Sequence, residues 1–308
     1  MEQIKLPDGF RIFETQVAGH TFQNAEPEKL GMIKDERTGC VLKPSGKPEC
    51  GEREFSFYNA LQNTEDPVLL QAKSLVPKFY SKVELLINQR KCTFFKLEDL
   101  THNLSKPCIM DIKIGKRTWD PLATAQKREY EEQKYIKCKQ TLGLCLPGFQ
   151  LYTPNSDKVL RYGREHGRNI DSNEFRASIA LFLNAQHTVC IPLVQEILNQ
   201  LKVIRKWFQI QRFYNFYASS LLIVYDFDLL QKLCLKHDHN CKIINGNAQM
   251  GNSGNLIENV TPDLKKWVKV RMIDFAHVFP TEQVSLDTNY IFGLQNLIAV
   301  IQDLLKQK

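Results

Sequence analysis

The run PCIMDIKIG, residues 107–115, constrains the fold of this chain more than any other stretch. Its apolar and charged residues alternate with the period of a β-strand, so Asp111 and Lys113 project from one face. A carboxylate beside an ammonium group suits phosphoryl transfer, in which positive charge stabilises the transferring oxygens and a carboxylate positions a hydroxyl or nucleotide. A surface ion pair on an exposed strand face is the simpler alternative.

The length of 308 residues predicts one large domain or two packed lobes. No run approaches the roughly 20 apolar residues of a membrane span, and the first residues lack the apolar segment of a signal peptide. The nine cysteines form no CxxC pair, which indicates reduced thiols in a cytoplasmic or nuclear protein. The net charge of +7 favours anionic partners without distinguishing nucleic acid, lipid headgroups and phosphorylated metabolites.

Residues 1–100 are expected to form a strand-rich, nucleotide-binding lobe. Residues 32–34 and 40–43 flank a polar turn, so we predict a hairpin whose second strand ends at Lys43. Helices are predicted over 52–61 and 67–79, and a buried strand over 92–97. Lys43 could neutralise nucleotide phosphates, with Glu54 on the following helix holding it by an ion pair.

Residues 101–308 are expected to form a second lobe. Helix propensity predicts a charged helix over 121–139, and further helices are expected over 172–185, 192–213 and 288–305, the last two from their apolar spacing. Strands are predicted over 216–225 and 267–275 and could pair as neighbours. The polar stretch between these strands predicts a mobile loop at about 235–264. Asp274 closes the last strand, where a hard oxygen ligand suits Mg²⁺ and a solvated strand-end aspartate is the alternative.

Four potential zinc ligands lie within this loop region, at Cys234, His237, His239 and Cys241. Their spacing is cramped and irregular compared with that of structural zinc sites. A polar loop rich in Lys, His and Asn is therefore the preferred interpretation.

Three motifs, in order along the chain, carry a resemblance to a known family. The first is PCIMDIKIG at 107–115, which resembles the PxxxDxKxG signature of the inositol polyphosphate kinases; the others are ASSLL at 218–222 and IDFAH at 273–277, similar to the SSLL and IDF segments of that family. The resemblance extends from about Gly39 to the C-terminus. Within the family the multikinase branch is the most similar, on the strings KLED at 96–99, CIMD at 108–111 and NFYASS at 215–220.

The resemblance implies a two-lobed α+β fold, kinase-like or ATP-grasp-like, with a small helical substrate-binding insert at about 117–175. It implies ATP and Mg²⁺ as cofactors. On the nucleotide side, Lys43 would contact ATP phosphates with Glu54 as its partner, Glu98 and Leu100 would form the hinge that holds adenine, and Asp111 would lie between nucleotide and substrate.

The resemblance also implies the metal and substrate residues. Asp274 would bind the metal with Ser220 in support. Lys113 would be catalytic with Asp111 and would also meet the substrate. The residues implied to bind the inositol phosphate are Lys113, Lys127, Lys134 and His277. The chain departs from the multikinase pattern at Tyr130 and Glu131, where that pattern has glutamines.

The implied activity is ATP-dependent phosphorylation of inositol trisphosphate and tetrakisphosphate towards pentakisphosphate, with phosphoinositide headgroups as further candidate substrates. The alternatives are an inositol trisphosphate 3-kinase or an inositol hexakisphosphate kinase, and, from another class, a non-catalytic scaffold with a kinase fold. The chain lacks a Walker A motif and an HRD segment, so it is not expected to be a protein kinase. We expect a monomer, cytoplasmic and nuclear, that requires no nucleic acid and has no transmembrane segment.

Overall fold

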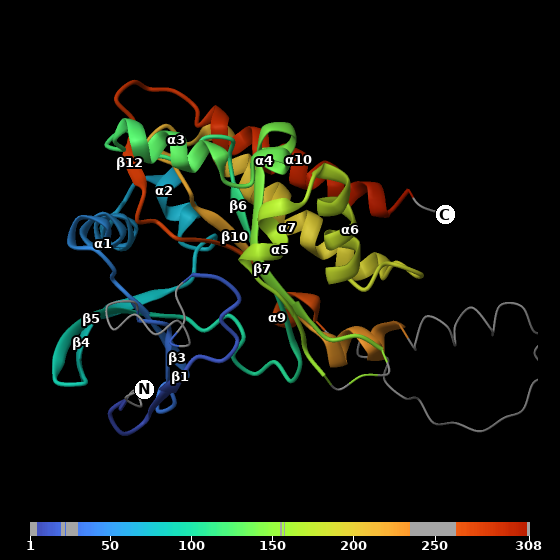
Figure 1. Cartoon of the computed structure of the whole chain (residues 1–308), viewed down its shortest axis with the longest axis horizontal. Coiled ribbons are helices and arrows are strands. Elements are labelled where there is room, and N and C mark those ends of the chain that lie inside the picture. Colours follow the sequence, from blue (N-terminus) through green and yellow to red (C-terminus); the bar gives the residue numbers. More distant parts are fainter. Residues whose placement is uncertain are drawn as a thin grey trace, which may run out of the picture.

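The computed structural model describes residues 5–19, 22, 30–154, 156, 158–234 and 263–306, and its two main sheets form the centres of two lobes (Figure 1). The strands of the first sheet all precede residue 98, and those of the second all follow residue 106. The lobe boundary predicted at residue 100 therefore falls in the short connection between the sheets.

The N-terminal sheet is antiparallel, with the strand order β1-β2-β3-β5-β4. Its strands are β1 (Phe10–Ile12), β2 (Ile33–Asp35), β3 (Cys40–Pro44), β4 (Phe79–Ile87) and β5 (Arg90–Leu97). The predicted hairpin is confirmed, since β2 pairs with β3. Helix α1 (Pro48–Asn63) follows β3 directly, which brings Glu54 close to the end of that strand.

The predicted helix over 67–79 is wrong in its second half. Helix α2 (Pro67–Ala72) is short, and residue 79 already begins strand β4. Pro77 explains the difference, because the ring of a proline disfavours helical geometry in the residue before it.

The β4–β5 turn contains Asn88 and Gln89 at φ values of 46° and 62°, the left-handed pair typical of a two-residue hairpin.

The C-terminal sheet is also antiparallel, with the order β11-β10-β6-β7-β8. Its strands are β6 (Pro107–Ile114), β7 (Leu144–Leu151), β8 (Leu160–Tyr162), β10 (Ser220–Asp226) and β11 (Val268–Ile273). The expected pairing of the last two is confirmed. Strand β6 is central, with β10 along one edge and β7 along the other, and only Lys113 within it is not buried.

Long amphipathic helices cover this sheet (Figure 1). They are α6 (Ser172–Phe182), α7 (Ile191–Ile210) and α10 (Thr288–Leu304), which confirms three of the predicted helices. Helix α10 packs against both α6 and α7, and α7 packs on β11. The apolar stripe predicted on α7 is buried in the main core, at Val194, Leu198, Leu201, Ile204 and Phe208.

The predicted single helix over 121–139 is wrong, because it is two helices, α3 (Ala125–Gln133) and α4 (Ile136–Leu142). The break is at Tyr135, which has a φ of 55° and a side chain that is almost fully buried. Burying this aromatic ring outweighs the helix propensity of its neighbours. Strands β7 and β8 belong to the main sheet, so the helical part of the region at 117–175 consists of α3, α4, the short α5 (Arg164–Asn169) and the first residues of α6.

The predicted strand over 216–225 is likewise interrupted. Residues Tyr214–Phe216 form β9, which pairs with β12 (Val278–Pro280) in a separate two-stranded sheet, whereas β10 begins at Ser220. Ala218, between the two strands, has a φ of 50° and turns the chain from one sheet to the other. The short α9 (Leu264–Trp267) precedes β11.

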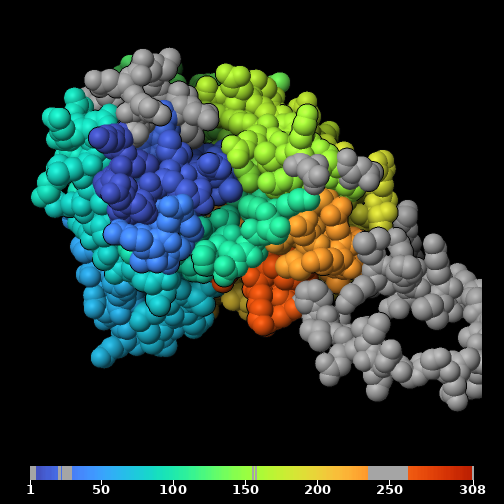
Figure 2. Space-filling model, turned by 90° about the horizontal axis from the view of Figure 1, so that it is seen from below, coloured from blue at the N-terminus to red at the C-terminus, as the bar shows by residue number. Residues whose placement is uncertain are grey.

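The N-terminal residues contact both lobes (Figure 2). The main-chain N–H of Phe13 donates to the carbonyl of Met32 in the first lobe, while Arg161 donates to the carbonyl of Glu14 from the second. A Cβ atom at Gly148 in β7 would lie 2.1 Å from the carbonyl oxygen of Val17. Glycine is therefore required there, because the N-terminal backbone lies directly against the second sheet.

Most of the loop predicted at about 235–264 lies outside the described residues, as do His237, His239 and Cys241. Within the described part of the chain, no group of three or more His, Cys, Asp and Glu side chains could hold a metal ion. None of the eight described cysteines is in a disulfide. In the same ranges, none of the helices combines the length and the apolar character needed to cross a bilayer.

Candidate functional site

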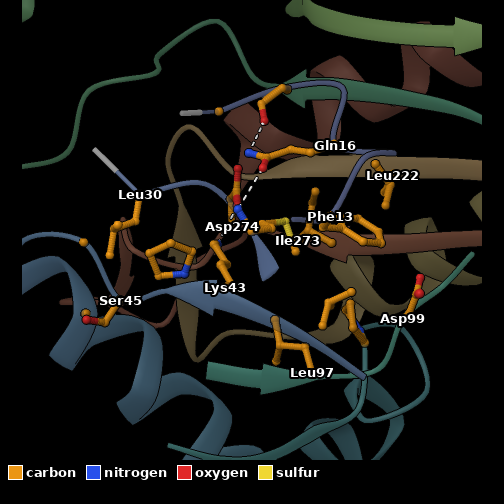
Figure 3. Close-up of a pocket in the computed structure, with 18 of the residues that line it drawn as sticks. Phe13, Gln16, Leu30, Lys43, Ser45, Leu97, Asp99, Leu222, Ile273 and Asp274 are labelled. Atoms are coloured by element: carbon orange, nitrogen blue, oxygen red, sulfur yellow. Dashed lines mark hydrogen bonds and ion pairs between the residues drawn. The ribbon is translucent and has the colours of Figure 1, made fainter. Parts of the chain in front are cut away.

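A cavity of about 900 Å³ lies between the two lobes, within the size range of small-molecule sites. Both sheets contribute to its wall: Lys43 comes from β3, Asp111 from β6, and Asp274 from the residue after β11. Figure 3 shows Lys43 next to Asp274, with Leu97 and Asp99 further along the same pocket. The connection between the lobes forms one wall, since residues 97–101 line the cavity.

Two lysines and two carboxylates form a continuous set of ion pairs at one end of this cavity. Lys43 Nζ lies 2.8 Å from Glu54 Oε1 and 2.6 Å from Asp274 Oδ1, so the predicted ion pair between Lys43 and Glu54 is confirmed. Lys113 Nζ lies 3.9 Å from Asp274 Oδ2. The two lobes are thus joined through Asp274, and cationic and anionic groups face the same space.

Strand β6 places Asp111 and Lys113 on one face, as its alternation predicts. In the register with β10, Asp111 stands opposite Leu222 and Lys113 opposite Ser220. Lys113 Nζ donates to the carbonyl of Ala218 at 2.8 Å, which fixes the ammonium group. Ala218 lies between β9 and β10 in a left-handed conformation, which is an uncommon geometry for a residue with a Cβ.

Asp274 also has left-handed geometry, with a φ of 63°. Non-glycine residues in this region are strained by about 1–3 kcal/mol and concentrate at functional sites. The twist at the end of β11 directs the carboxylate towards Lys43 and Lys113, whereas a continued strand would place it in register with the sheet. Asp274 thus combines a strained backbone conformation with ion pairs to both lysines.

The pKa values of the two aspartates diverge. Burial raises the pKa of Asp111 to about 6, against the attraction of Lys113, and the negative charge of Asp274 adds to the rise. Burial would also raise the pKa of Asp274, but Lys43 and Lys113 lower it to about 2. Near neutral pH, Asp274 is therefore always ionised, while Asp111 titrates close to the working range.

Two buried oxygens beside this set have no hydrogen-bond partner of regular geometry among the described residues, although Ser220 lies close enough to Asp111 to act against the rise in its pKa. They are Asp111 Oδ1 and Ser220 Oγ, and both residues are almost completely buried. Buried polar atoms are normally satisfied, so unpaired hard oxygens next to the Asp274 carboxylate indicate room for a ligand that is held there. Ser220 is the first residue of β10 and stands opposite Ile273, one residue before Asp274.

The hinge residues named from the sequence line the same cavity. Glu98 and Leu100 follow β5, and the main-chain N–H of Glu98 donates to the carbonyl of Lys78. Sequence reasoning missed Asp99 between them, which is buried and forms an ion pair with Lys34. The signal was weak, because one aspartate in a polar connector does not reveal a lysine 65 residues away.

Two of the lysines assigned to substrate binding, Lys127 and Lys134, lie on and just after α3 and do not belong to the ion-paired set. Lys127 and Lys134 both contact Glu131 Oε1, at 3.0 and 2.7 Å, and Lys134 also lies over the ring of Tyr130. Lys127 is about half exposed. The two residues that depart from the multikinase pattern are therefore the ones that contact these lysines.

His277 lies on the loop that follows Asp274, and its Nδ1 is 2.5 Å from Asp120 Oδ2. Asp120 was not identified from the sequence, since an Asp before a proline reads as a turn residue. The structure thus places Lys43, Glu54, Lys113 and Asp274 in one set of ion pairs, with Asp111 and Ser220 beside it. His277, Lys127 and Lys134 form separate contacts.

The comparisons with known proteins agree with this geometry. A family model described as inositol polyphosphate kinase matches residues 94–302. The chain belongs to the inositol polyphosphate kinase family. It is therefore an enzyme of the kinase class that acts on inositol phosphates.

Among curated relatives, human inositol polyphosphate multikinase is 28% identical, with 98% of this chain and 90% of that protein covered. Mouse inositol hexakisphosphate kinase 1 is 31% identical over 68% of this chain and 51% of its own length. Among solved structures, the inositol phosphate multikinase Ipk2 of S. cerevisiae, in complex with ADP and Mn²⁺, matches with a TM-score of 0.62 and 22% identity, covering 86% of this chain and 99% of that one. The α+β kinase-like fold is confirmed.

Proposed function

We propose that this kinase transfers the γ-phosphate of ATP to ring hydroxyls of inositol polyphosphates, from trisphosphate and tetrakisphosphate towards pentakisphosphate, in the manner of a multikinase. The observation that carries the proposal is the convergence of Lys43, Asp111 and Asp274, from both lobes, on one cavity, with Lys113 paired to Asp274. The near-complete coverage of the multikinase relative supports this substrate class over the hexakisphosphate kinases, whose match spans about half their length.

The cavity has a suitable place for each part of the nucleotide. Apolar side chains beside the connecting segment offer a surface for adenine, with Val41, Leu97, Ile109 and Leu222 in its wall. Main-chain groups at Glu98 and Leu100 would hold its polar edge. The phosphates would extend towards Lys43, whose pKa is raised because Asp274 and Glu54 outweigh the effect of its burial.

The buried oxygens fit a divalent cation, for which we propose Mg²⁺. Asp274 would bind it, with Ser220 Oγ in support and the unpaired Asp111 Oδ1 close by. Mg²⁺ typically takes one or two carboxylates together with nucleotide phosphates and water, so a site without a complete protein cage is suitable. When bound, the cation would neutralise charge on the phosphates during transfer.

The chain's own residues would act mainly by position and charge. Lys113, fixed by the carbonyl of Ala218, would stabilise the oxygens of the transferring group. Asp111, with a pKa of about 6, is poised to orient the acceptor hydroxyl and take its proton. Transfer would be direct and in line, without a phosphorylated enzyme intermediate.

The test is incubation of purified protein with ATP, Mg²⁺ and a panel of inositol phosphates and phosphoinositides, followed by chromatographic identification of the products. Successive phosphorylation of trisphosphate and tetrakisphosphate is expected. Products limited to one tetrakisphosphate or to pyrophosphates would instead assign a 3-kinase or a hexakisphosphate kinase. Replacing Mg²⁺ with Mn²⁺ or Ca²⁺ in parallel tests the metal assignment.

A matched pair of variants separates catalysis from folding. Asp274→Asn should lower kcat by at least about 100-fold, because it removes the charge that would bind the metal. Asp263→Asn is the control, since Asp263 caps α9 on the exposed surface. Full activity in Asp274→Asn would refute the metal role, and an inactive wild type would favour the scaffold alternative.

We also propose that the chain acts as a monomer in the cytoplasm and nucleus. The described cysteines, none of which is in a disulfide, support a reducing compartment. Light scattering on the purified protein and imaging of a tagged chain would test the two parts separately.

A further inference from the structure

The contact between Asp120 and His277 joins two segments that are far apart in the sequence. Asp120 Oδ2 lies 2.5 Å from His277 Nδ1, and the aspartate side chain is only 9% exposed while the imidazole is 37% exposed. The hydrogen bond is therefore shielded from water at one end, while the ring remains accessible at the other. Shielded hydrogen bonds of this kind hold their geometry better than exposed ones.

The segment that carries Asp120 is held rigidly. Asp120 Oδ1 accepts a hydrogen bond from the main-chain N–H of Leu122 at 2.9 Å, and the Asp120 carbonyl accepts one from the N–H of Ala123. Upstream, the side chain of Asn289 on α10 bonds both the N–H and the carbonyl of Arg117. One carboxylate oxygen thus fixes the turn, which leaves the other for His277.

The backbone around His277 is fixed as well. Its carbonyl accepts from the N–H of Tyr217, and the carbonyl of Ala276 accepts from Arg53 Nε at 2.9 Å. Strand β12 then begins at Val278 and pairs with β9. Main-chain and side-chain contacts together restrict both the position and the rotation of the imidazole.

A carboxylate can only accept hydrogen bonds, so the bonded Nδ1 must carry the hydrogen. Nε2 is then the nitrogen that remains for other partners. In the neutral ring it is an acceptor, and in the cation it is a donor. The ring lies three residues after Asp274 and is close enough for its charge to contribute to the field around that carboxylate.

We propose that Asp120 is a positioning residue for the kinase reaction, which holds His277 as the Nδ1–H tautomer so that Nε2 is presented to the inositol phosphate. This inference rests on the proposed function, because it takes His277 as a substrate-contacting residue. Asp120 then does more than stabilise the fold through an ion pair. It fixes the ring tautomer, which decides the protonation of the nitrogen that faces the substrate.

The first test leaves Asp120 unchanged. Long-range ¹H–¹⁵N spectra of the whole chain labelled at histidine, recorded where imidazole is neutral, report the tautomer directly. The His277 signals are assigned as those missing from His277→Gln. Protonated Nδ1 and unprotonated Nε2 are expected, and a ring protonated on Nε2 would overturn the proposal.

The second test is Asp120→Asn, which changes one atom and keeps the turn. The amide oxygen can still accept from Leu122, but the amide nitrogen only donates, so Nδ1 must give up its hydrogen. His277 should switch to the Nε2–H tautomer. In parallel, kcat/KM for the inositol phosphate should fall by about 10- to 100-fold with little change in KM for ATP.

Asp66→Asn is the matched control. Asp66 is also a turn aspartate, but its carboxylate accepts from the main-chain N–H groups of Val68 and Leu69 at the start of α2. It should change neither the tautomer nor the inositol phosphate kinetics. Equal kinetics for wild type and Asp120→Asn, or an unchanged tautomer, would overturn the proposal. A tautomer switch in a chain that phosphorylates no inositol phosphate would leave the positioning contact standing and refute the proposed function.

Discussion

Substitution of Gly115 tests why the strand with Asp111 and Lys113 must end in glycine. Gly115 has a φ of 109°, which residues with a Cβ rarely adopt, and a Cβ built there would lie 2.3 Å from Asn289 Nδ2. The side chain of Asn289 cannot simply move away, because it holds the N–H and carbonyl of Arg117 at 2.9 and 3.0 Å. Gly115→Ala must therefore strain the backbone and also break these contacts.

Both costs can be sized. A non-glycine residue held at such a φ costs about 1–3 kcal/mol. Displacing Asn289 forfeits two hydrogen bonds, each worth about 0.5–1.5 kcal/mol. The expected loss in the free energy of unfolding is therefore about 2–6 kcal/mol, which is a large fraction of the stability of an ordinary domain.

The assay is urea unfolding of the wild type, Gly115→Ala and the matched control Gly46→Ala. Gly46 also has a positive φ, of 71°, but nothing lies within 4 Å of its built Cβ, so only the backbone cost of about 1 kcal/mol is expected. In an Asn289→Ala background, Gly115→Ala should cost less, because the obstructing amide is gone. The reasoning is refuted if Gly115→Ala loses no more than Gly46→Ala, or if Asn289→Ala fails to reduce its cost.

Three further predictions concern the charged set and one turn. Lys43→Met should destabilise the fold by about 3–5 kcal/mol in urea unfolding, because the Glu54 side chain is 2% exposed and would lose its ion-pair partner. The double variant Lys43→Met/Glu54→Leu should recover part of this loss. A double variant whose loss of stability equals the sum of the two single losses would contradict the prediction. Since the pKa of Asp111 is raised by burial to about 6, the folded chain binds more protons than the unfolded chain between about pH 4 and 6, so stability falls as pH rises through that window by up to about 3 kcal/mol. Asp111→Asn should remove this slope, and parallel stability profiles of the two proteins would show that the shift is absent. Gln89→Gly should raise the unfolding free energy by about 1 kcal/mol, because glycine adopts the φ of 62° without a steric cost, and a loss of stability would argue against a left-handed turn there.

The sequence by itself determined the local elements whose periodicity is strong and the family to which they belong. The alternation over residues 107–115 placed Asp111 and Lys113 on one strand face, and the apolar spacing on α7 and α10 identified their buried stripes. These features follow from side-chain geometry within one element, so they can be read without knowing what packs against it. Asp111, Lys113, Ser220 and Asp274, which are proposed to act on nucleotide and metal, came from the three family motifs.

Only the tertiary structure decided the features that depend on distant partners. Tyr135 breaks a helix that propensity alone would continue, because its ring finds a place in the core. Asp274 adopts a strained conformation that is held by Lys43 from the other lobe, and Asp120 gains its proposed role from a histidine 157 residues away. Such contacts cross between elements, and their energies are set by distance and burial, which the order of residues does not encode locally.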